Sequence, residues 1–202
     1  MRTLKLLLIF IFCFAIYGFA EEKSLLIDNL DGPIHTGAEA TVDYGAGNGS
    51  SVEVSSDTHI KYFDKQSLKV VYDAVAGGYM WVARGFGLDA QKAVWLKKPE
   101  EIDWKAYNCI SFYMYGSNSK VRVAFDVKDS GNEMFRQVTT DDFNGWKQIV
   151  LQFKDFKPRE DWQPANANKN ANIDFPIKSY QFEPLPESKG TLYFDRVELI
   201  NR

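Results

Sequence analysis

The sequence is poor in cysteine. Only two cysteines, Cys13 and Cys109, occur among its 202 residues. Cys13 lies in an apolar run near the start of the chain, whereas Cys109 begins the strand-like stretch CISFYMY. A domain that follows the apolar run therefore contains a single cysteine and cannot form an internal disulfide. We expect it to be held together by its hydrophobic core, with or without a bound metal.

The chain also has neither an excess nor a cluster of basic residues. Its 24 Lys and Arg residues stand against 27 Asp and Glu residues, which gives a formal net charge of −3. Proteins that bind nucleic acid usually carry basic patches, because the phosphate backbone attracts Lys and Arg. We therefore expect no nucleic-acid partner.

Long apolar runs are absent except at the N-terminus. The opening MRTLKLLLIFIFCFAIYGFA has Arg2 and Lys5 before an apolar run over residues 6–20 that ends in small residues. The run is shorter than the roughly 20 apolar residues that span a bilayer. It is typical of a secretory signal peptide cleaved after Ala20. The sequence thus predicts a secreted or periplasmic protein with one domain over residues 21–202.

Motifs of nucleophilic catalysis and phosphate binding are missing too. The chain has only two histidines, His35 and His59, and no GxSxG motif that would present a nucleophilic serine. The stretch GAGNGS, residues 45–50, precedes a predicted strand. A phosphate-binding loop would instead open a helix, so we interpret this stretch as a turn.

A spaced pair of catalytic carboxylates is not evident either. Glycoside hydrolysis needs two carboxyl groups about 5 to 10 Å apart, on either side of the scissile bond. Acidic residues occur at suitable places, but none belongs to a motif of the required spacing. The candidates are Asp126, Glu160, Asp161 and Glu183. The sequence therefore predicts a protein that is not an enzyme, and a small glycosidase or lyase remains a minor alternative.

What the sequence does contain is a series of short segments with period-two hydrophobicity, separated by Gly, Asn, Asp and Pro. No helical period is sustained, and only residues 99–107 suggest a turn of helix. Such a series is typical of an all-β fold, an antiparallel β-sandwich of the jelly-roll kind. The expected strands are residues 25–30, 51–55, 67–75, 79–86, 109–115, 120–129, 133–140, 146–153, 179–184 and 191–200.

Alternation along these strands assigns their side chains to two faces. In the segment 120–129, Val123, Phe125 and Val127 are expected in the core, with Arg122 and Asp126 on the open face. In the segment 179–184 the alternation places Tyr180 and Phe182 inward and Gln181 outward. The segment 133–140 is ambiguous, because Met134 and Phe135 compete for the core. Alternation therefore does not decide on which face of the strand Arg136 lies.

Aromatic residues are abundant, with five tryptophans in one small domain. Trp104 and Trp146 precede strands and are expected to anchor the core or an edge. Trp81 stands in a strand near Arg84, and Trp162 lies in a long loop that begins near Lys154 and contains ANANKNANIDF. An aromatic face beside planar hydrogen-bonding groups suits a sugar ring. The alternative is that Trp162 covers the edge of the sandwich.

Several longer stretches resemble a known family. SLKVVYDAVAGGYMWVARGF, IDWKAYNCISFYMYGS, GWKQIVLQFKDF and GTLYFDRVELI are similar to the glucan-binding carbohydrate-binding modules of family eleven and related galactose-binding-like jelly rolls, over roughly residues 25–200. The resemblance implies a concave sheet face that binds a β-glucan chain without catalysis. It matches the family's Arg-x-Asp-aromatic cluster to Arg159, Asp161 and Trp162. Family members commonly have Tyr at the last position.

The resemblance also implies a structural calcium ion between the first strand and the last. Asp195 matches the acidic residue of the last strand, and Asp28 or Asp31 would be its partner. A hard cation needs several oxygen ligands, which carboxylates and backbone carbonyls supply. The alternative is that turn N–H groups satisfy these acids without a metal.

The leading hypothesis is an exported, non-catalytic protein that binds a β-linked glucan or a similar polysaccharide. Because such modules usually accompany catalytic domains, the resemblance implies a separate glycoside hydrolase as a partner. The alternative is a structural or assembly protein of the cell envelope that uses the same face for a protein partner. The expected carbohydrate-binding residues are Trp81, Arg84, Arg122, Asp126, Arg159, Asp161, Trp162 and Gln181, and the expected metal ligands are Asp28 and Asp195.

Overall fold

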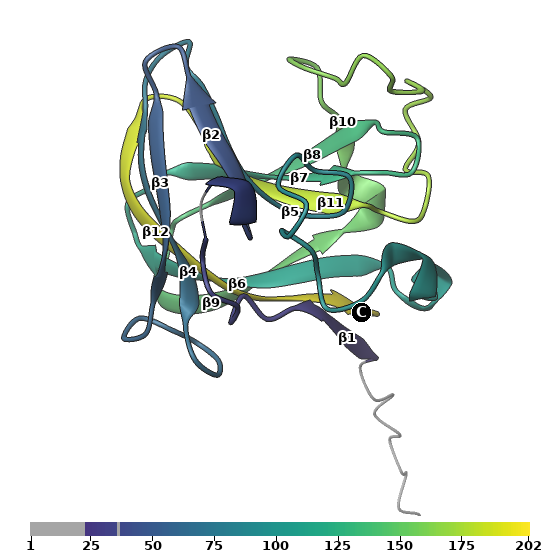
Figure 1. Ribbon diagram of the computed structural model, residues 1–202, viewed down its shortest axis with the longest axis horizontal. Helices are drawn as coiled ribbons and strands as arrows, with labels where there is room; N and C mark the ends of the chain where they lie inside the picture. The colour runs from purple at the N-terminus through teal and green to yellow at the C-terminus, as the bar shows by residue number, and fades with distance from the viewer. Residues whose placement is uncertain (1–22, 36) are drawn as a thin grey trace, which may run out of the picture.

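The computed structural model, which describes residues 23–35 and 37–202, is a sandwich of two antiparallel sheets (Figure 1). This confirms the predicted all-β class. Sheet A has the order β3 (Ser51–Asp57), β4 (Ser67–Ala74), β12 (Ser188–Ile200), β6 (Cys109–Ser117) and β9 (Asn144–Gln152), with β1 (Ser24–Asp28) paired to β12. Sheet B has the order β10 (Lys157–Pro158), β8 (Met134–Thr140), β7 (Arg122–Lys128), β11 (Ser179–Pro184), β5 (Tyr79–Gly85) and β2 (Asp43–Gly47).

The core lies between the two sheets and is built from the predicted inward-facing residues. Phe112 and Phe194 of sheet A pack against Phe125 and Phe182 of sheet B. The rings of Phe112 and Phe125 stack with centroids 4.9 Å apart, and those of Phe182 and Phe194 stack at 3.8 Å. All four side chains are fully buried. Because side chains alternate along each strand, the residues between them face outward and are free to form a site.

The structure resolves the ambiguous strand β8. Phe135 enters the core and is 1% exposed, so Met134 and Arg136 lie on the outer face of sheet B. Arg136 stands directly opposite Asp126 of β7 in the register of the two strands. The outer face of β8 therefore carries a cation beside a buried carboxylate.

The strand β2 was missed by the sequence analysis, and so was the two-residue β10. The stretch at residues 45–50 is only partly the predicted turn, because residues 45–47 end β2 and pair with β5. The turn itself covers residues 47–50, where the Ser50 N–H donates to the Gly47 carbonyl at 3.2 Å. Asn48 and Gly49 adopt positive φ angles of 53° and 89°, as a tight turn requires.

Short 3-10 turns supply the remaining regular structure among the described residues. They are η1 (Gly37–Glu39), η2 (Pro99–Glu101), η3 (Trp104–Ala106) and η4 (Phe153–Asp155). Trp104 is buried, and its indole Nε1 donates to the Pro99 carbonyl at 2.9 Å, which confirms its anchoring role. Trp146 is half-buried on β9 at the edge of sheet A, 5.5 Å from the ring of Tyr115.

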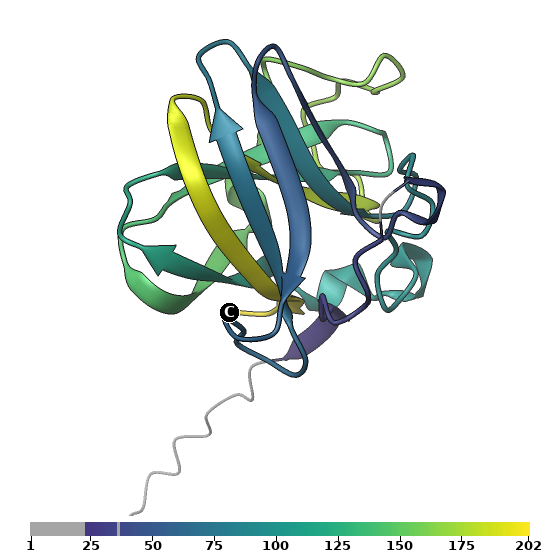
Figure 2. The ribbon, with the colours of Figure 1, turned by 60° about the vertical axis from the view of Figure 1, so that its left-hand side comes forward.

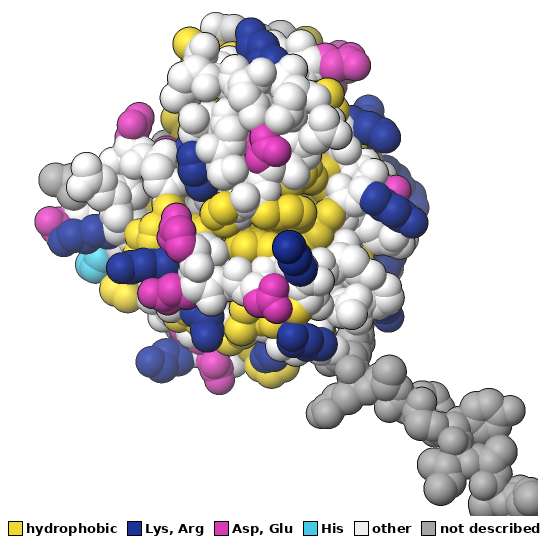
Figure 3. All heavy atoms as spheres, turned by 90° about the vertical axis from the view of Figure 1, so that its right-hand side faces the viewer, with side chains coloured by type: hydrophobic (Ala, Val, Ile, Leu, Met, Phe, Trp, Pro, Cys, Tyr) yellow, Lys and Arg dark blue, Asp and Glu magenta, His cyan; other side chains and the backbone are white. Residues whose placement is uncertain are grey.

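The views of the whole molecule show how the connections are placed. Figure 2 shows β12, β4 and β3 of sheet A side by side. In Figure 1 the turn between β2 and β3 and the loop of residues 159–178 stand well apart, near the top of the molecule. Figure 3 shows Lys and Arg interspersed with Asp and Glu around a band of hydrophobic side chains. None of the described segments forms an apolar helix long enough to cross a membrane.

Candidate carbohydrate-binding cleft

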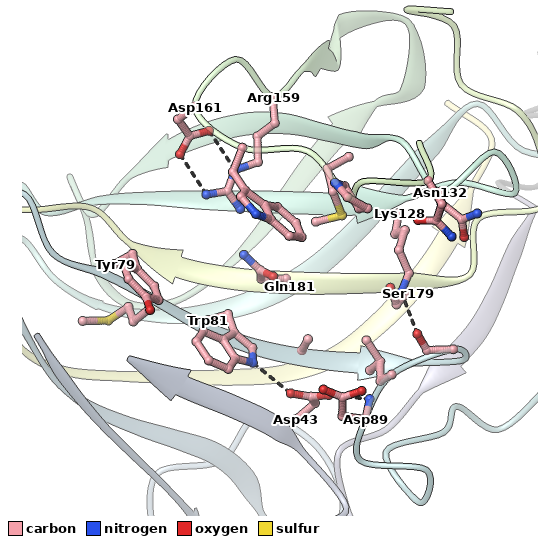
Figure 4. Close-up of a pocket in the computed structure, with 18 residues that line it drawn as sticks. Asp43, Tyr79, Trp81, Asp89, Lys128, Asn132, Arg159, Asp161, Ser179 and Gln181 are labelled. Atoms are coloured by element: carbon pink, nitrogen blue, oxygen red, sulfur yellow. Dashed lines mark hydrogen bonds and ion pairs between the residues drawn. The ribbon is translucent and has the colours of Figure 1, made fainter. Parts of the chain in front are cut away.

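A cleft of about 830 Å³ crosses the outer face of sheet B. One wall is formed by Tyr79 and Trp81 of β5, and the other by Arg159, Asp161 and Trp162 of the loop after β10. Gln181 of β11 lies between the two walls (Figure 4). The cleft therefore combines aromatic surface with a small number of polar groups, as ligand sites usually do.

The aromatic wall presents two parallel rings. Tyr79 and Trp81 are two residues apart on β5, so their side chains leave the same face of the sheet. Their ring centroids lie 6.3 Å apart, and the planes differ by only 12°. Tyr79 is 50% exposed. The Trp81 indole Nε1 donates to Asp43 Oδ1 at 2.8 Å, which fixes the orientation of the ring.

The opposite wall is the segment whose composition suggested a sugar site. Arg159 donates from Nε and Nη2 to the two oxygens of Asp161, at 2.9 and 2.8 Å. This bidentate pair lowers the pKa of Asp161 to about 2. Trp162 is 55% exposed, and the Arg159 guanidinium lies 5.8 Å from its ring centroid. The indole thus lies open to the cleft.

A buried ionic network supports this wall from beneath. Asp126 is fully buried and accepts hydrogen bonds from Arg136 Nε at 2.7 Å, Arg159 Nη1 at 3.0 Å and Gln181 Nε2 at 3.1 Å. Arg136 also pairs with Glu183. Burial raises the pKa of Glu183, while the charges of Arg159 and Arg136 oppose that rise. Buried charges persist when each has partners of opposite sign, so the network holds Arg159 and Gln181 in fixed positions.

Five of the eight residues expected from the sequence line the cleft. They are Trp81, Arg159, Asp161, Trp162 and Gln181. Asp126 lies beneath them and acts through Arg159 and Gln181. Arg122 is exposed at the start of β7 and is not part of the cleft lining.

Arg84 was wrongly expected at the open face. It points between the sheets, where its Nε donates to Asp28 Oδ2 at 2.6 Å and its Nη2 to Asp28 Oδ1 at 2.9 Å. Burial disfavours its charge, but the ion pair with Asp28 dominates and raises the pKa of Arg84. The reason for the error is geometric, because residues 81 and 84 are an odd number of positions apart and face opposite sides of β5.

Several lining residues were not anticipated from the sequence. Tyr79 could have been found, because it shares a face with Trp81. Asp43 comes from the unpredicted strand β2, and its Oδ2 accepts the N–H groups of Asp89 and Ala90 at 2.9 and 3.2 Å. The other unanticipated lining residues include Met80, Ala83, Lys128, Asn132, Met134 and Ser179.

The predicted calcium pair does not fit as proposed. Both oxygens of Asp28 accept hydrogen bonds from Arg84, and Oδ2 also accepts the Tyr180 hydroxyl at 2.9 Å. A guanidinium at both oxygens occupies the place of a cation. Asp195 differs, because its Oδ1 atom is buried without a hydrogen-bond partner while Oδ2 accepts the N–H groups of Tyr62 and Phe63. Among the described residues, no group of three or more His, Cys, Asp or Glu side chains could hold a metal.

Comparison with known proteins identifies the family. The sequence model described as "Carbohydrate binding domain (family 11)" matches residues 20–202. The chain belongs to this family. This confirms the resemblance seen in the sequence, and it makes the domain a non-catalytic carbohydrate-binding module. No curated protein sequence matches the chain.

Solved structures of other carbohydrate-binding modules share the fold. The family 11 module of the cellulosomal cellulase Lic26A-Cel5E of Clostridium thermocellum is 19% identical, with a TM-score of 0.67 over 89% of this chain and 95% of that one. A family 11 module from the same organism, in complex with a β-1,3-1,4-mixed-linked tetrasaccharide, is 22% identical, with a TM-score of 0.65 and the same coverage. The family 30 module of its cellulase Cel9D-Cel44B is 14% identical, with a TM-score of 0.55 over 88% and 99%.

Proposed function

We propose that this family 11 domain binds a single chain of a β-linked glucan, or a similar polysaccharide, in the cleft on sheet B. The observation that carries the proposal is the facing of two parallel aromatic rings, Tyr79 and Trp81, across Gln181 toward Arg159 and Asp161. The family 11 structure that holds a mixed-linked tetrasaccharide supports this class of ligand.

The physical basis is the two-sided character of a sugar ring. Its C–H face packs on an aromatic ring, and its rim of hydroxyls exchanges hydrogen bonds with planar polar groups. Arg159, Asp161 and Gln181 are held by the ionic network before any ligand arrives. Binding then costs little side-chain entropy, which favours affinity.

The test is affinity electrophoresis of residues 21–202 through native gels that contain mixed-linkage β-glucan, laminarin, xylan, glucomannan or no polymer. We expect one or more polymers to retard the protein and Trp162→Ala to relieve the retardation. Trp146→Ala is the matched control, because Trp146 is a half-buried indole on sheet A, away from the cleft. Free migration in every gel would contradict the proposal and favour a protein partner at this face.

We propose further that the protein is exported. The support is the basic start, the apolar run and the small residues before Glu21, all of which lie outside the described residues. Expression of the full chain in a host with a secretory pathway should release a product that begins at Glu21. N-terminal sequencing measures this, and a product that stays in the cytoplasm with Met1 intact would contradict it.

We also propose that a hard cation such as Ca²⁺ binds at Asp195. The support is the unsatisfied buried Oδ1 atom, together with the nearby carboxylate of Asp31, which adds negative charge. A cation bound only by the folded state raises the thermal midpoint, so a chelator should lower it and added Ca²⁺ should restore it. Identical melting curves with and without chelator would remove Asp195 from the metal ligands.

A further inference from the structure

Two glycines lie directly beneath the aromatic wall of the cleft. In the antiparallel register of β2 and β5, Gly45 pairs with Trp81 and Gly47 pairs with Tyr79. Residues opposite each other in such a pair send their side chains to the same face of the sheet. The indole and the phenol therefore occupy the space where side chains at positions 45 and 47 would stand.

The rings of Trp81 and Tyr79 lie across β2, very close to its backbone. A Cβ atom built on Gly45 would be 2.5 Å from Trp81 Cη2 and 2.6 Å from Cζ2. A Cβ atom on Gly47 would be 2.7 Å from Tyr79 Cε1, with Cζ and the hydroxyl closer still. Real Cβ contacts are essentially never shorter than 3.0 Å, so neither ring could keep its place over an alanine.

The backbone does not itself require glycine at these positions. Neither Gly45 nor Gly47 is among the residues of positive φ. Glycine within a strand weakens it, because it has no side chain to pack and loses more conformational entropy on folding. Two such residues, alternating at the spacing of Tyr79 and Trp81, indicate that the space above them is needed for the rings.

We propose that Gly45 and Gly47 are positioning residues for carbohydrate recognition, which hold Trp81 and Tyr79 flat on β2 as one platform for successive sugar rings of an extended chain. This role rests on the proposed function. The glycines do not contact the sugar. They set the tilt of the two rings, while Asp43 fixes the rotation of the indole through its hydrogen bond to Nε1.

An alanine at position 45 should displace the indole while the strand stays intact. The clashing atoms are the far edge of the Trp81 side chain, which can swing toward solvent. A swing of the ring breaks the Trp81–Asp43 hydrogen bond and tilts the platform. Stability should change little, because alanine suits a strand backbone at least as well as glycine does.

The experiment is a double-mutant cycle measured by isothermal titration calorimetry with a mixed-linkage β-glucan oligosaccharide. We expect Gly45→Ala and Gly47→Ala each to weaken binding about tenfold or more, the range of a lost aromatic contact. Gly32→Ala is the matched control, because a Cβ atom at Gly32 meets nothing within 4 Å, and it should bind within about twofold of the wild type.

The cycle separates a positioning role from a general effect on the fold. In a Trp81→Ala background the clash is gone, so adding Gly45→Ala should leave both affinity and thermal midpoint unchanged. Indole fluorescence should also report greater exposure of Trp81 in Gly45→Ala alone. If both glycine variants bind as the wild type does, or if Gly45→Ala costs as much without Trp81 as with it, the positioning role is wrong. A wild type that binds no glucan would overturn the proposed function and this role together.

Discussion

The change Trp162→Ala tests whether the loop after β10 binds a ligand. Trp162 is 55% exposed. An indole presents roughly 200 Å² of surface, so about 110 Å² remains open, and a sugar stacked on one face would cover about half of it. At about 25 cal/mol per Å² of apolar surface, this amounts to about 1.4 kcal/mol, or a tenfold loss of affinity. Polar contacts near the ring extend the expected loss of binding free energy to about 1–3 kcal/mol.

The same variant should barely change the stability of the fold. The ring of Trp162 lies beside the guanidinium of Arg159, and an exposed cation–π contact contributes about 0.5–1 kcal/mol. A domain of this size then loses about 1–4 °C in thermal midpoint. Calorimetric titration and thermal melts of wild type, Trp162→Ala and Trp146→Ala measure both quantities. A large fall in midpoint with unchanged affinity would refute the reasoning and make Trp162 a packing residue of the sandwich edge.

Three further changes probe the ionic groups. Asp126→Ala removes one of the two buried carboxylates that pair with Arg136 and Arg159, and should cost about 3 kcal/mol in denaturant unfolding, together with a loss of sugar binding. Arg84→Ala should destabilise the fold by a similar amount, because it leaves Asp28 buried and unpaired, yet any protein that remains folded should bind sugar normally. The pKa of Asp161, about 2, lies below its ordinary value, so its ion pair stabilises the fold above about pH 4 and is lost as the pH falls toward 2. Asp161→Asn should therefore remove that acid dependence, and a variant with the same stability profile as the wild type from pH 5 to pH 2 would contradict the assignment.

Alternation and turn residues were enough to predict most of the fold. Each of the ten segments read as strands contains a strand of the structure. The sequence analysis missed the strand β2, because its segment DYGAG shows little alternation of hydrophobic and polar residues. Its glycines lie beneath the aromatic rings of the neighbouring strand β5. No local sequence pattern indicates a contact between strands that are about 35 residues apart in the chain.

Alternation along separate strands was enough to predict Trp81 and Gln181, and one loop segment carries the other predicted lining residues. Arg159, Asp161 and Trp162 are consecutive enough to be seen together, and the structure places all three in the cleft lining. The interior placement of Arg84 depends on Asp28, a residue 56 positions away. Alternation already places residue 84 on the opposite face of β5 from Trp81, so the pattern itself indicated an inward side chain. The ion pair with Asp28 explains how a charged group can lie there.

The charge of the cleft adds a constraint on which polysaccharides it can take. Arg136 and Arg159 carry two positive charges in the network, whereas Asp126, Asp161 and Glu183 carry three negative ones. Both guanidinium groups are already paired with carboxylates. The other charged residues of the lining, Lys128, Asp43 and Asp89, add one positive and two negative charges, and the exposed Asp161 would repel an anionic sugar. We therefore expect neutral glucans to bind and polygalacturonate to leave the protein unretarded in the same gels at low salt. Retardation by polygalacturonate that increases as salt is lowered would show instead that a cation of the cleft, either Lys128 or an Arg159 released from Asp161, pairs with the ligand.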